Sequence, residues 1–275
     1  SSNMAKNLER IFFKENFRRA HHTEPGALVD IPQVVEFYRE GFLRALNTEL
    51  IRKAAWTVVV DFNFSPACLV LPTLLNELGC NVIALNAYVD EAKGGITPKP
   101  KAEALAQMTA IVGSLKAQAG FWLEPNAEAI TLVDESGALF EGASLLALVT
   151  ALKLKSDQRG AIAVPVQAPS LIEQMALKKK CAVTRTKSND RAMLEAANSS
   201  EVFLAGTIDG RFAFPRFQAA FDGMFAIAKL IELSAAQNLP FSRVLADVPG
   251  QTFLQTSTPC PFEMKGGIMR KMSED

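Results

Sequence analysis

The sequence has few of the side chains on which most catalytic and metal centres depend. It contains only two histidines, His21 and His22, and no cysteine pair with the CxxC spacing of a metal or redox motif. The histidines lie together in a polar loop, where a surface role is favoured over metal binding. No Ser/His/Asp or Cys/His arrangement is present, and no glycine-rich loop of the GxGxxG or GxxxxGKS type. These absences exclude the common hydrolase and nucleotide-binding motifs.

The chain also lacks an excess of either charge and any long apolar run. Its formal net charge is +0 and its pI is about 6.7, so we expect neither nucleic acid nor a membrane as a partner. No apolar run approaches the roughly 18 residues of a membrane span. The four cysteines lie in apolar or strand-like surroundings, which predicts reduced thiols and a cytoplasmic protein.

What the sequence does contain is core-forming material in alternating strands and helices. With 275 residues, 49% of them hydrophobic, the chain is long enough for one large domain or two medium ones. Thr57–Phe62 and Asn81–Leu85 are apolar runs typical of buried strands, and Ser65-Pro66 begins a helix between them. Pro72 lies within that helix and is expected to kink it. Strand, helix and strand in this order predict a right-handed crossover with parallel strands.

The first unit ends in a hairpin and a helix. Gly120–Leu123 and Ile130–Val133 are short strand-like runs on either side of a turn that contains Pro125 and Asn126, which predicts an antiparallel pair. Gly142–Leu154 is the helix that we expect to close the unit.

After a polar break at Lys155–Gly160, the same order of elements recurs. The predicted elements are the strand Ala161–Val166, the helix Pro169–Lys179, the strand Cys181–Thr186, the helix Arg191–Asn198, the strands Glu201–Ala205 and Phe212–Phe214, and a long helix with Phe217, Phe221, Met224, Ala228 and Ile231 on its core-facing side. The repeated order predicts an α/β protein with two tandem three-layer α/β/α domains. Each domain is expected to have a mixed sheet whose last strand is antiparallel.

The flanking segments predict parts of further units. Ile31–Asn47 has the spacing of an amphipathic helix, and Asn47–Ala55 is interpreted as a polar connector. Thr252–Gln255 and Phe262–Lys271 are expected to be the first strand and helix of a unit that the chain does not finish. We therefore divide the chain into an N-terminal helical connector, two central domains and the start of a truncated C-terminal domain, with the bounds 1–52, 53–155, 156–250 and 251–275.

The hairpin turn holds the most suggestive polar cluster. Glu124, Asn126 and Glu128 alternate along it, so their oxygens are able to point toward one centre. Mg²⁺ prefers such carboxylate and carbonyl oxygens. Short acidic turns are common at protein surfaces, and from the residues alone a plain surface turn is the favoured alternative.

Several stretches carry a resemblance to a known family. TVVVDFNFSPACLVLPTLLNELGCNVIALNA, the hairpin ending in ITLVDE, and AIAVPVQAPSLIEQMA with VTRTKSNDRAMLEAA resemble the second and third domains of the α-D-phosphohexomutases, the phosphoglucomutase/phosphomannomutase family. The resemblance covers about Lys53 to Gly250. The opening NLERIFFKENFRR and the closing PCPFEMKGGIMRKM more narrowly resemble the mutase-like region of fusions in which a mannose-1-phosphate guanylyltransferase-like domain comes first.

The resemblance implies which residues stand at the family's functional loops. Family members use a phosphoserine loop, a DGDGDR metal loop for Mg²⁺, a GEESG sugar loop and a phosphate-binding loop, of which the first and last have no counterpart here. The metal loop aligns with Glu124–Ala129, where Pro125 and Ala127 replace both glycines. We expect that loop to hold no metal, and the chain to need no cofactor of its own. The sugar-loop equivalents are degenerate, and they are Gly206, Thr207, Ile208, Asp209 and Gly210.

Basic residues remain where the family places cations that face the substrate phosphate. Arg185, Lys187 and Arg191 stand at this position, and Lys178–Lys180 precede them. Cationic groups bind phosphate through charge-assisted hydrogen bonds, but a solvated basic face has the same composition. Both interpretations remain open at this point.

The resemblance and the altered loops together imply two classes of function. The first is part of a phosphohexomutase-like protein of nucleotide-sugar and carbohydrate metabolism, from a guanylyltransferase-like fusion, in which this chain is inactive alone. The second is a non-catalytic module that binds a sugar phosphate or supports assembly with the missing domains of the same polypeptide.

Overall fold

The computed structural model describes residues 2–16, 19–21, 23, 26–27, 29, 31–90, 98–156, 160–246 and 259–274. The chain separates into two compact units, Ser1–Phe37 and Tyr38–Asp275. The first unit contains helix α1 (Ser2–Phe13) and the start of helix α2 (Val34–Arg44). The predicted strand Thr252–Gln255 and His22 lie outside the described residues, whereas the predicted terminal helix is present as α11 (Phe262–Glu274).

The second unit holds both sheets. Its first half consists of α3 (Thr48–Ala54), β1 (Thr57–Asp61), η1 (Pro66–Leu69), α4 (Leu71–Glu77), β2 (Asn81–Leu85), α5 (Pro98–Leu115), β3 (Ala119–Leu123), β4 (Ile130–Asp134), β5 (Leu139–Phe140) and α6 (Gly142–Lys155). Its second half consists of β6 (Ala161–Pro165), α7 (Leu171–Lys178), β7 (Ala182–Thr186), α8 (Asp190–Ala197), β8 (Val202–Gly206), β9 (Phe212–Ala213), α9 (Gly223–Gln237) and α10 (Phe241–Val244).

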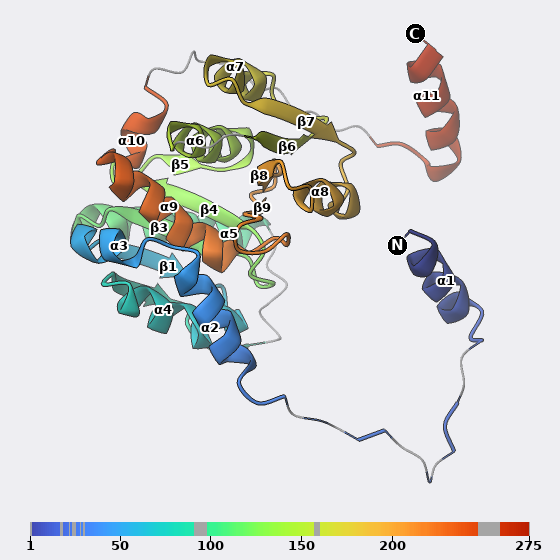
Figure 1. Cartoon of the computed structure of the whole chain (residues 1–275), viewed down its shortest axis with the longest axis horizontal. Helices are drawn as coiled ribbons and strands as arrows, with labels where there is room; N and C mark the ends of the chain where they lie inside the picture. The colour runs from blue at the N-terminus through green and yellow to red at the C-terminus, as the bar shows by residue number, and fades with distance from the viewer. Residues whose placement is uncertain are drawn as a thin grey trace. The chain divides into compact units, whose positions relative to one another are not determined.

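The two sheets repeat one topology. The first has the order β2-β1-β3-β4-β5 and the second the order β7-β6-β8-β9 (Figure 1). In each, the first three strands are parallel and the next is antiparallel to its neighbour. The predicted fold class, an α/β protein with two tandem α/β/α domains and mixed sheets, is therefore confirmed. The short β5, which extends the first sheet, has no counterpart in the second.

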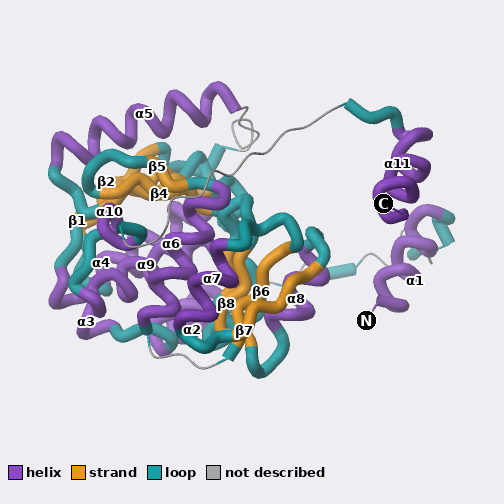
Figure 2. The backbone as a smooth tube through the Cα atoms, turned by 90° about the horizontal axis from the view of Figure 1, so that it is seen from above, coloured by secondary structure: helices purple, strands orange, loops and turns teal. Residues whose placement is uncertain are grey.

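Two helices form the layer that the sheets share. Helix α6 contacts β5 of the first sheet and β8 of the second, while α9 contacts β3, β4 and β9 as well as α6. Figure 2 shows α6 and α9 between the sheets, with α5 and α8 on their outer faces. One continuous apolar core, containing residues of both sheets and both helices, joins the two repeats. The relative position of the turns at the strand ends is therefore fixed by packing.

The predicted polar connector Asn47–Ala55 is wrong, because this segment contains helix α3. The side chain of Asn47 accepts a hydrogen bond from the backbone N–H of Leu50 at 3.2 Å, which caps the helix. Ile51 is fully buried and anchors the helix to the core. The polar composition of this segment did not predict a helix, because the helix depends on the Asn47 cap and on the burial of Ile51. The preceding helix accordingly ends at Arg44, before the predicted Asn47.

Two predicted helices also differ at their N-termini. Pro72 does not kink a continuous helix, because η1 ends before Val70 and α4 begins after it. Pro72 therefore stands in the first turn of α4, where the helix needs no backbone N–H from it. Phe217 and Phe221 precede α9 instead of lying on it, since Asp222 caps that helix by accepting from the N–H of Phe225 at 2.8 Å.

A buried charge stands out in the shared helical layer. Lys153 of α6 is 4% exposed. Burial, and next the charge of Lys229, lowers the pKa of Lys153 to about 8, from an ordinary value of 10.5. The protonated side chain therefore destabilises the folded state below pH 8.

Lys153→Met is expected to raise the free energy of unfolding near pH 7. The lowered pKa, at about 1.4 kcal/mol per unit, corresponds to about 3 kcal/mol. Because the unfolded lysine binds its proton more tightly, this cost is complete below pH 8 and disappears as the pH rises toward 10.5. Urea denaturation of wild type and variant between pH 7 and pH 10 measures the difference, which should shrink steadily. A pH-independent difference would contradict a charged, destabilising Lys153.

Candidate functional site

The hairpin turn between β3 and β4 is closed by its own backbone. The N–H of Glu124 donates to the carbonyl of Ala129 at 3.0 Å, and the N–H of Ala127 donates to the carbonyl of Glu124 at 2.8 Å. Ala127 has a φ of 60°, the left-handed region that favours glycine, although it carries a Cβ. The turn therefore keeps a tight reversal without the glycines of the family loop.

The three predicted metal-ligand residues do not converge. Asn126 turns its Oδ1 back to accept from the N–H of Glu128 at 3.2 Å. Burial raises the pKa of Glu124, while Glu128 lies 4.0 Å from the guanidinium of Arg211. Within the described residues there is no group of three His, Cys, Asp or Glu side chains suited to a metal ion.

The turn between β8 and β9 contains the sugar-loop equivalents Gly206, Thr207, Ile208, Asp209 and Gly210. The hydroxyl of Thr207 donates to the carboxylate of Asp209 and accepts from the N–H of Arg211. Burial alone would raise the pKa of Asp209, but hydrogen bonds from Arg211 and Thr207 outweigh it and hold that pKa below its ordinary value. The polar atoms of this turn are thus bonded within it.

The two turns are joined through their backbones. The N–H of Ile130 donates to the carbonyl of Gly210 at 3.0 Å. A second bond ties the hairpin turn to the start of α9, where the N–H of Gly223 donates to the carbonyl of Ala127 at 2.8 Å. A Cβ on Gly210 would lie 2.4 Å from the carbonyl oxygen of Ile130, so a glycine is needed at this approach. We call these paired segments, residues 124–130 and 206–211, the joint.

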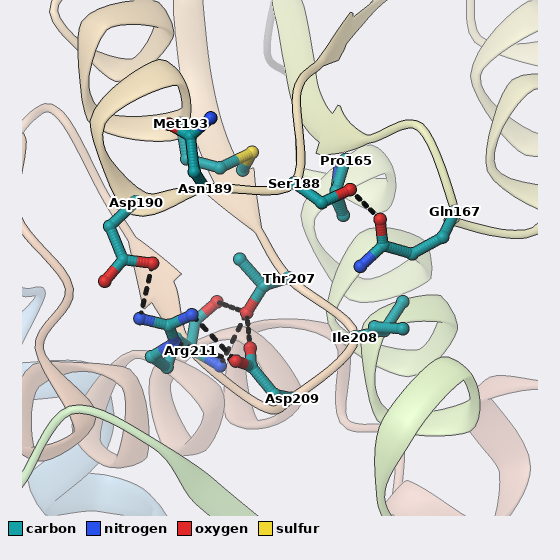
Figure 3. Close-up of a pocket in the computed structure, with 10 residues that line it drawn as sticks. All are labelled: Pro165, Gln167, Ser188, Asn189, Asp190, Met193, Thr207, Ile208, Asp209 and Arg211. Atoms are coloured by element: carbon teal, nitrogen blue, oxygen red, sulfur yellow. Dashed lines mark hydrogen bonds and ion pairs between the residues drawn. The ribbon is translucent and has the colours of Figure 1, made fainter. Parts of the chain in front are cut away.

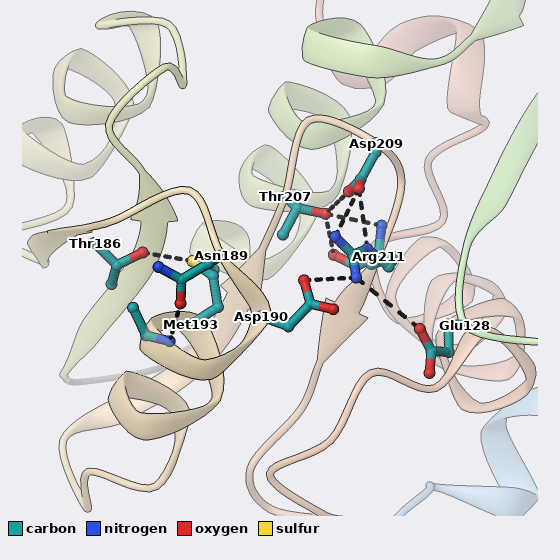
Figure 4. A network of polar contacts seen from close by, with 9 residues as sticks. Glu128, Thr186, Asn189, Asp190, Met193, Thr207, Asp209 and Arg211 are labelled. Carbon is teal, nitrogen blue, oxygen red and sulfur yellow. Dashed lines mark hydrogen bonds and ion pairs between the residues drawn. The ribbon is translucent and has the colours of Figure 1, made fainter. Parts of the chain in front are cut away.

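Arg211 connects the side chains of the joint (Figure 4). Its guanidinium lies 2.8 Å from Asp190 of α8, 2.7 Å from Asp209 and 4.0 Å from Glu128. It also stacks over the ring of Phe221 at 4.8 Å. Burial would lower the pKa of Arg211, but hydrogen bonds to Asp209 and Asp190 raise it. Sequence analysis missed this residue, because its partners come from three separate segments.

A pocket of about 220 Å³ opens beside the joint at the carboxyl ends of β6, β7 and β8 (Figure 3). In α/β sheets, ligands bind in crevices at this end of the strands. The lining residues are Pro165, Gln167, Ser188, Asn189, Asp190, Met193, Thr207, Ile208, Asp209 and Arg211. Two of the sugar-loop equivalents that line the pocket, Thr207 and Asp209, are hydrogen-bonded to each other. The neutral side chains Gln167 and Ser188 are also hydrogen-bonded to each other. The pocket is smaller than most sites for drug-sized ligands.

None of the predicted phosphate-binding residues lines that pocket. Arg185 lies 2.7 Å from Glu173 and donates to the carbonyls of Val166 and Ala168. Arg191 pairs with Glu195 on the next turn of α8 at 2.9 Å. Lys187 lies between β7 and α8, just before the lining residue Ser188. The structure does not bring the three cations together in this pocket, and phosphate binding by them stays a prediction.

Two further findings concern the rest of the described residues. None of the four cysteines takes part in a disulfide. None of the described helices has the length and hydropathy of a membrane span. His21 contacts Thr23 through its ring nitrogen at 2.9 Å.

Comparison with known protein families covers most of the chain. Residues 36–137 match the family described as phosphoglucomutase/phosphomannomutase, alpha/beta/alpha domain II. Residues 141–251 match the corresponding alpha/beta/alpha domain III. The joint is formed between one matched region and the other.

Individual relatives are similar over nearly the whole chain. A protein of Thermococcus kodakarensis named phosphoglucomutase/phosphomannomutase is 30% identical over 267 residues, which cover 97% of this chain and 58% of that protein. A probable phosphoglucosamine mutase of Methanopyrus kandleri is 29% identical and covers 90% of this chain and 54% of its own length. The chain thus spans little more than half the length of these relatives.

A solved structure shows the same fold. A phosphoglucomutase/phosphomannomutase family protein from Burkholderia thailandensis superposes with a TM-score of 0.74 at 18% identity, over 91% of this chain and 53% of that one. A phosphomannomutase-like structure from Thermus thermophilus gives a TM-score of 0.73 over 81% of this chain and 52% of its own.

Arg211→Gln is expected to lower the free energy of unfolding by about 1 kcal/mol or more, because the guanidinium is only 19% exposed and its charge-assisted bonds to three half-exposed carboxylates are lost. Arg191→Gln is the matched control, since it removes an exposed pair within one helix and should cost about 0.5 kcal/mol or less. Urea denaturation at low and high salt measures both. Equal losses in the two variants would show that Arg211 does not hold the joint.

Proposed function

Because the chain belongs to the phosphoglucomutase/phosphomannomutase family, we propose that it is a mutase-like module that does not itself catalyse phosphoryl transfer. The observation that carries this proposal is the joint. The turns that align with the metal and sugar loops are hydrogen-bonded to each other, and Arg211 pairs with carboxylates of both. A mutase needs these loops to face a metal and a substrate instead.

The hairpin residues do not fit Mg²⁺, which requires several oxygens in near-octahedral geometry. Asn126 uses its oxygen on the backbone of its own turn, and Glu128 faces Arg211. Glutamates are one methylene longer than the aspartates that they replace, which displaces their oxygens in a loop of the same size. We therefore assign no Mg²⁺-dependent step to this chain, and the prediction of a loop without metal stands as part of the proposal.

The sugar-loop residues lack the carboxylate pair that would orient sugar hydroxyls. Thr207 and Ile208 stand where the family has glutamates, and the Thr207 hydroxyl is engaged by Asp209 and Arg211. Ile208 offers no side-chain hydrogen bond. A hexose phosphate would therefore find few oriented contacts at this turn.

For the whole protein, we propose a place in nucleotide-sugar metabolism in the cytoplasm, with this chain fused to a mannose-1-phosphate guanylyltransferase-like domain. The resemblance of the opening and closing segments supports the fusion, and the unpaired cysteines support the compartment. The module would then assemble with the other domains of the same polypeptide. The coding sequence upstream decides this point, because a phosphoserine loop there would instead indicate a complete mutase.

A second candidate is sugar-phosphate binding without catalysis. The neutral side chains Gln167, Ser188 and Asn189 in the pocket at the carboxyl ends of the strands favour it, since they are able to bond sugar hydroxyls. The phosphate would have to reach Arg185, Lys187 or Arg191. Arg185 and Arg191 already pair with glutamates, so assembly is better supported than binding.

The purified chain is expected to show no phosphoglucomutase or phosphomannomutase turnover. Coupled assays with glucose 1-phosphate and mannose 1-phosphate, in the presence of the bisphosphate activator and Mg²⁺, measure this directly. The physical reason is the absence of oriented metal and sugar contacts at the joint.

Turnover that persists after repurification and is lost in a Glu124→Ala, Glu128→Ala variant would contradict the proposal. The Glu9→Ala, Glu103→Ala variant serves as the control, because it removes two acids outside the joint. Calorimetry with Mg²⁺ on the same proteins tests whether a metal accounts for any activity.

A further inference from the structure

Each sheet has one long edge strand in the described part of the chain. The first sheet ends at β2 and the second at β7, while the opposite edges are the short strands β5 and β9, of 2 residues each. Very short edge strands are protected from pairing with another chain, whereas long ones are not. Strand β7 pairs with β6 alone among the described strands (Figure 1). Its outer edge is therefore open to a further strand.

The outer backbone groups of β7 are those of Val183 and Arg185. Ala182 donates its N–H to the carbonyl that precedes β6, and Thr186 accepts from the N–H that follows β6. Successive residues of a strand direct their backbone groups to alternate sides, so the N–H and C=O of Val183 and Arg185 point away from β6. Such a row of donors and acceptors is a template for the addition of a strand.

Strand β7 carries none of the usual features that protect an edge. Its 5 residues pair with β6 in register, without a bulge, and none of them is proline. Its one charged side chain, Arg185, turns back to Glu173 at 2.7 Å and to the carbonyls of Val166 and Ala168. Natural edges are commonly blunted by bulges, by proline or by charges on the strand itself. The edge of β7 is left accessible.

Lysines stand at both ends of this strand. Lys178, Lys179 and Lys180 come just before it, and Lys187 directly follows it. All four are exposed, and none of them forms an ion pair with a described residue. The accessible edge is therefore positively charged at its two ends.

The charges select the kind of partner. A second copy of this chain that paired β7 with β7 in antiparallel order would bring residues 178–180 of one copy close to Lys187 of the other, and like charges across two strands repel. The edge strand β2 has Cys80 before it and Asn86 after it, so it offers no such charge. An acidic segment, in contrast, complements the lysines around β7.

We propose that β7 binds an acidic, extended segment of a partner protein as an added strand of the second sheet. The outer N–H and C=O groups of Val183 and Arg185 would form the backbone hydrogen bonds, and the flanking lysines would pair with carboxylates toward the two ends of the segment. The joint begins at β8, on the other side of β6. Binding at β7 is therefore separate from the joint and does not depend on whether the chain is catalytic.

Titration of the full chain with a short synthetic peptide of alternating glutamate and valine tests the proposal. Valine favours the extended conformation, and glutamate supplies the charge. The amides of Val183 and Arg185 should become protected from hydrogen exchange along the binding curve, whereas those of Ala182 and Thr184 already face β6 and should change little. The affinity should fall as salt is added.

Two changes test the backbone pairing itself. The same peptide with every backbone N–H methylated keeps its charges but donates no hydrogen bond, and it should bind about tenfold more weakly or worse. Val183→Pro removes the outer N–H without removing a bond to β6, and it should weaken binding of the unmodified peptide by a similar factor. Val183→Thr keeps that N–H, so this matched control should bind as wild type does.

A Lys179→Gln, Lys180→Gln variant tests the charge and keeps the proposal testable if Val183→Pro does not fold. It leaves the backbone edge intact and should weaken binding mainly at low salt, because surface charges are screened at high salt. Lys116→Gln removes an exposed lysine elsewhere and should have no effect. Equal binding of the methylated and unmodified peptides would overturn the proposal, because attraction by charge alone would then explain it. Peptide binding that leaves the amides of Val183 and Arg185 unprotected, or no binding at all, would overturn it as well.

Discussion

The structure depends on one close approach, in which the hairpin turn after β3 meets the turn after β8. The backbone hydrogen bond from Ile130 to Gly210 brings these turns into direct contact, and the bond from Gly223 to Ala127 ties the hairpin turn to the start of α9. The shared core of α6 and α9 sets the distance between the sheets, and glycine at 210 permits the approach. Arg211 then adds charge pairing with Glu128 of one turn, Asp209 of the other and Asp190 of α8. An interface held in this way is suited to a fixed module.

The fold was largely predictable because its determinants are local. β-Branched runs such as Thr57–Asp61 and the repeated order of strands and helices predict the parallel strands and the antiparallel one. The errors occurred where tertiary contacts override composition. Helix α3 depends on the Asn47 cap and the buried Ile51, and α9 begins only at the Asp222 cap. The ring of Phe217 stacks on that of Phe225, with the ring centres 4.3 Å apart. The spacing of apolar residues along a predicted helix does not predict this contact either.

The candidate site was only half predictable. The two turns were located from residue types and from alignment with the family's loops, but their pairing with each other was not. Arg211 has three carboxylate partners from separate segments, so no local spacing identifies it. Charge counting likewise did not reveal the partner of Arg185, because Glu173 lies twelve positions earlier on a neighbouring helix. In both cases, the net charge of a short stretch of sequence does not indicate which cationic side chains are already paired with carboxylates.

Hydrogen exchange tests the central claim, that the two turns form a fixed joint, most directly. The amide of Ile130 should exchange only with global unfolding, as slowly as core amides such as that of Val59, because its acceptor Gly210 lies on the opposite turn. The amide of Gly223, which binds the hairpin turn from the start of α9, should do the same. The amide of Glu128, whose bond to Asn126 is exposed, should exchange much faster and serves as the local reference. Exchange of Ile130 and Gly223 through a low-energy opening, while Val59 stays protected, would show that the turns separate in the native state and would contradict the account.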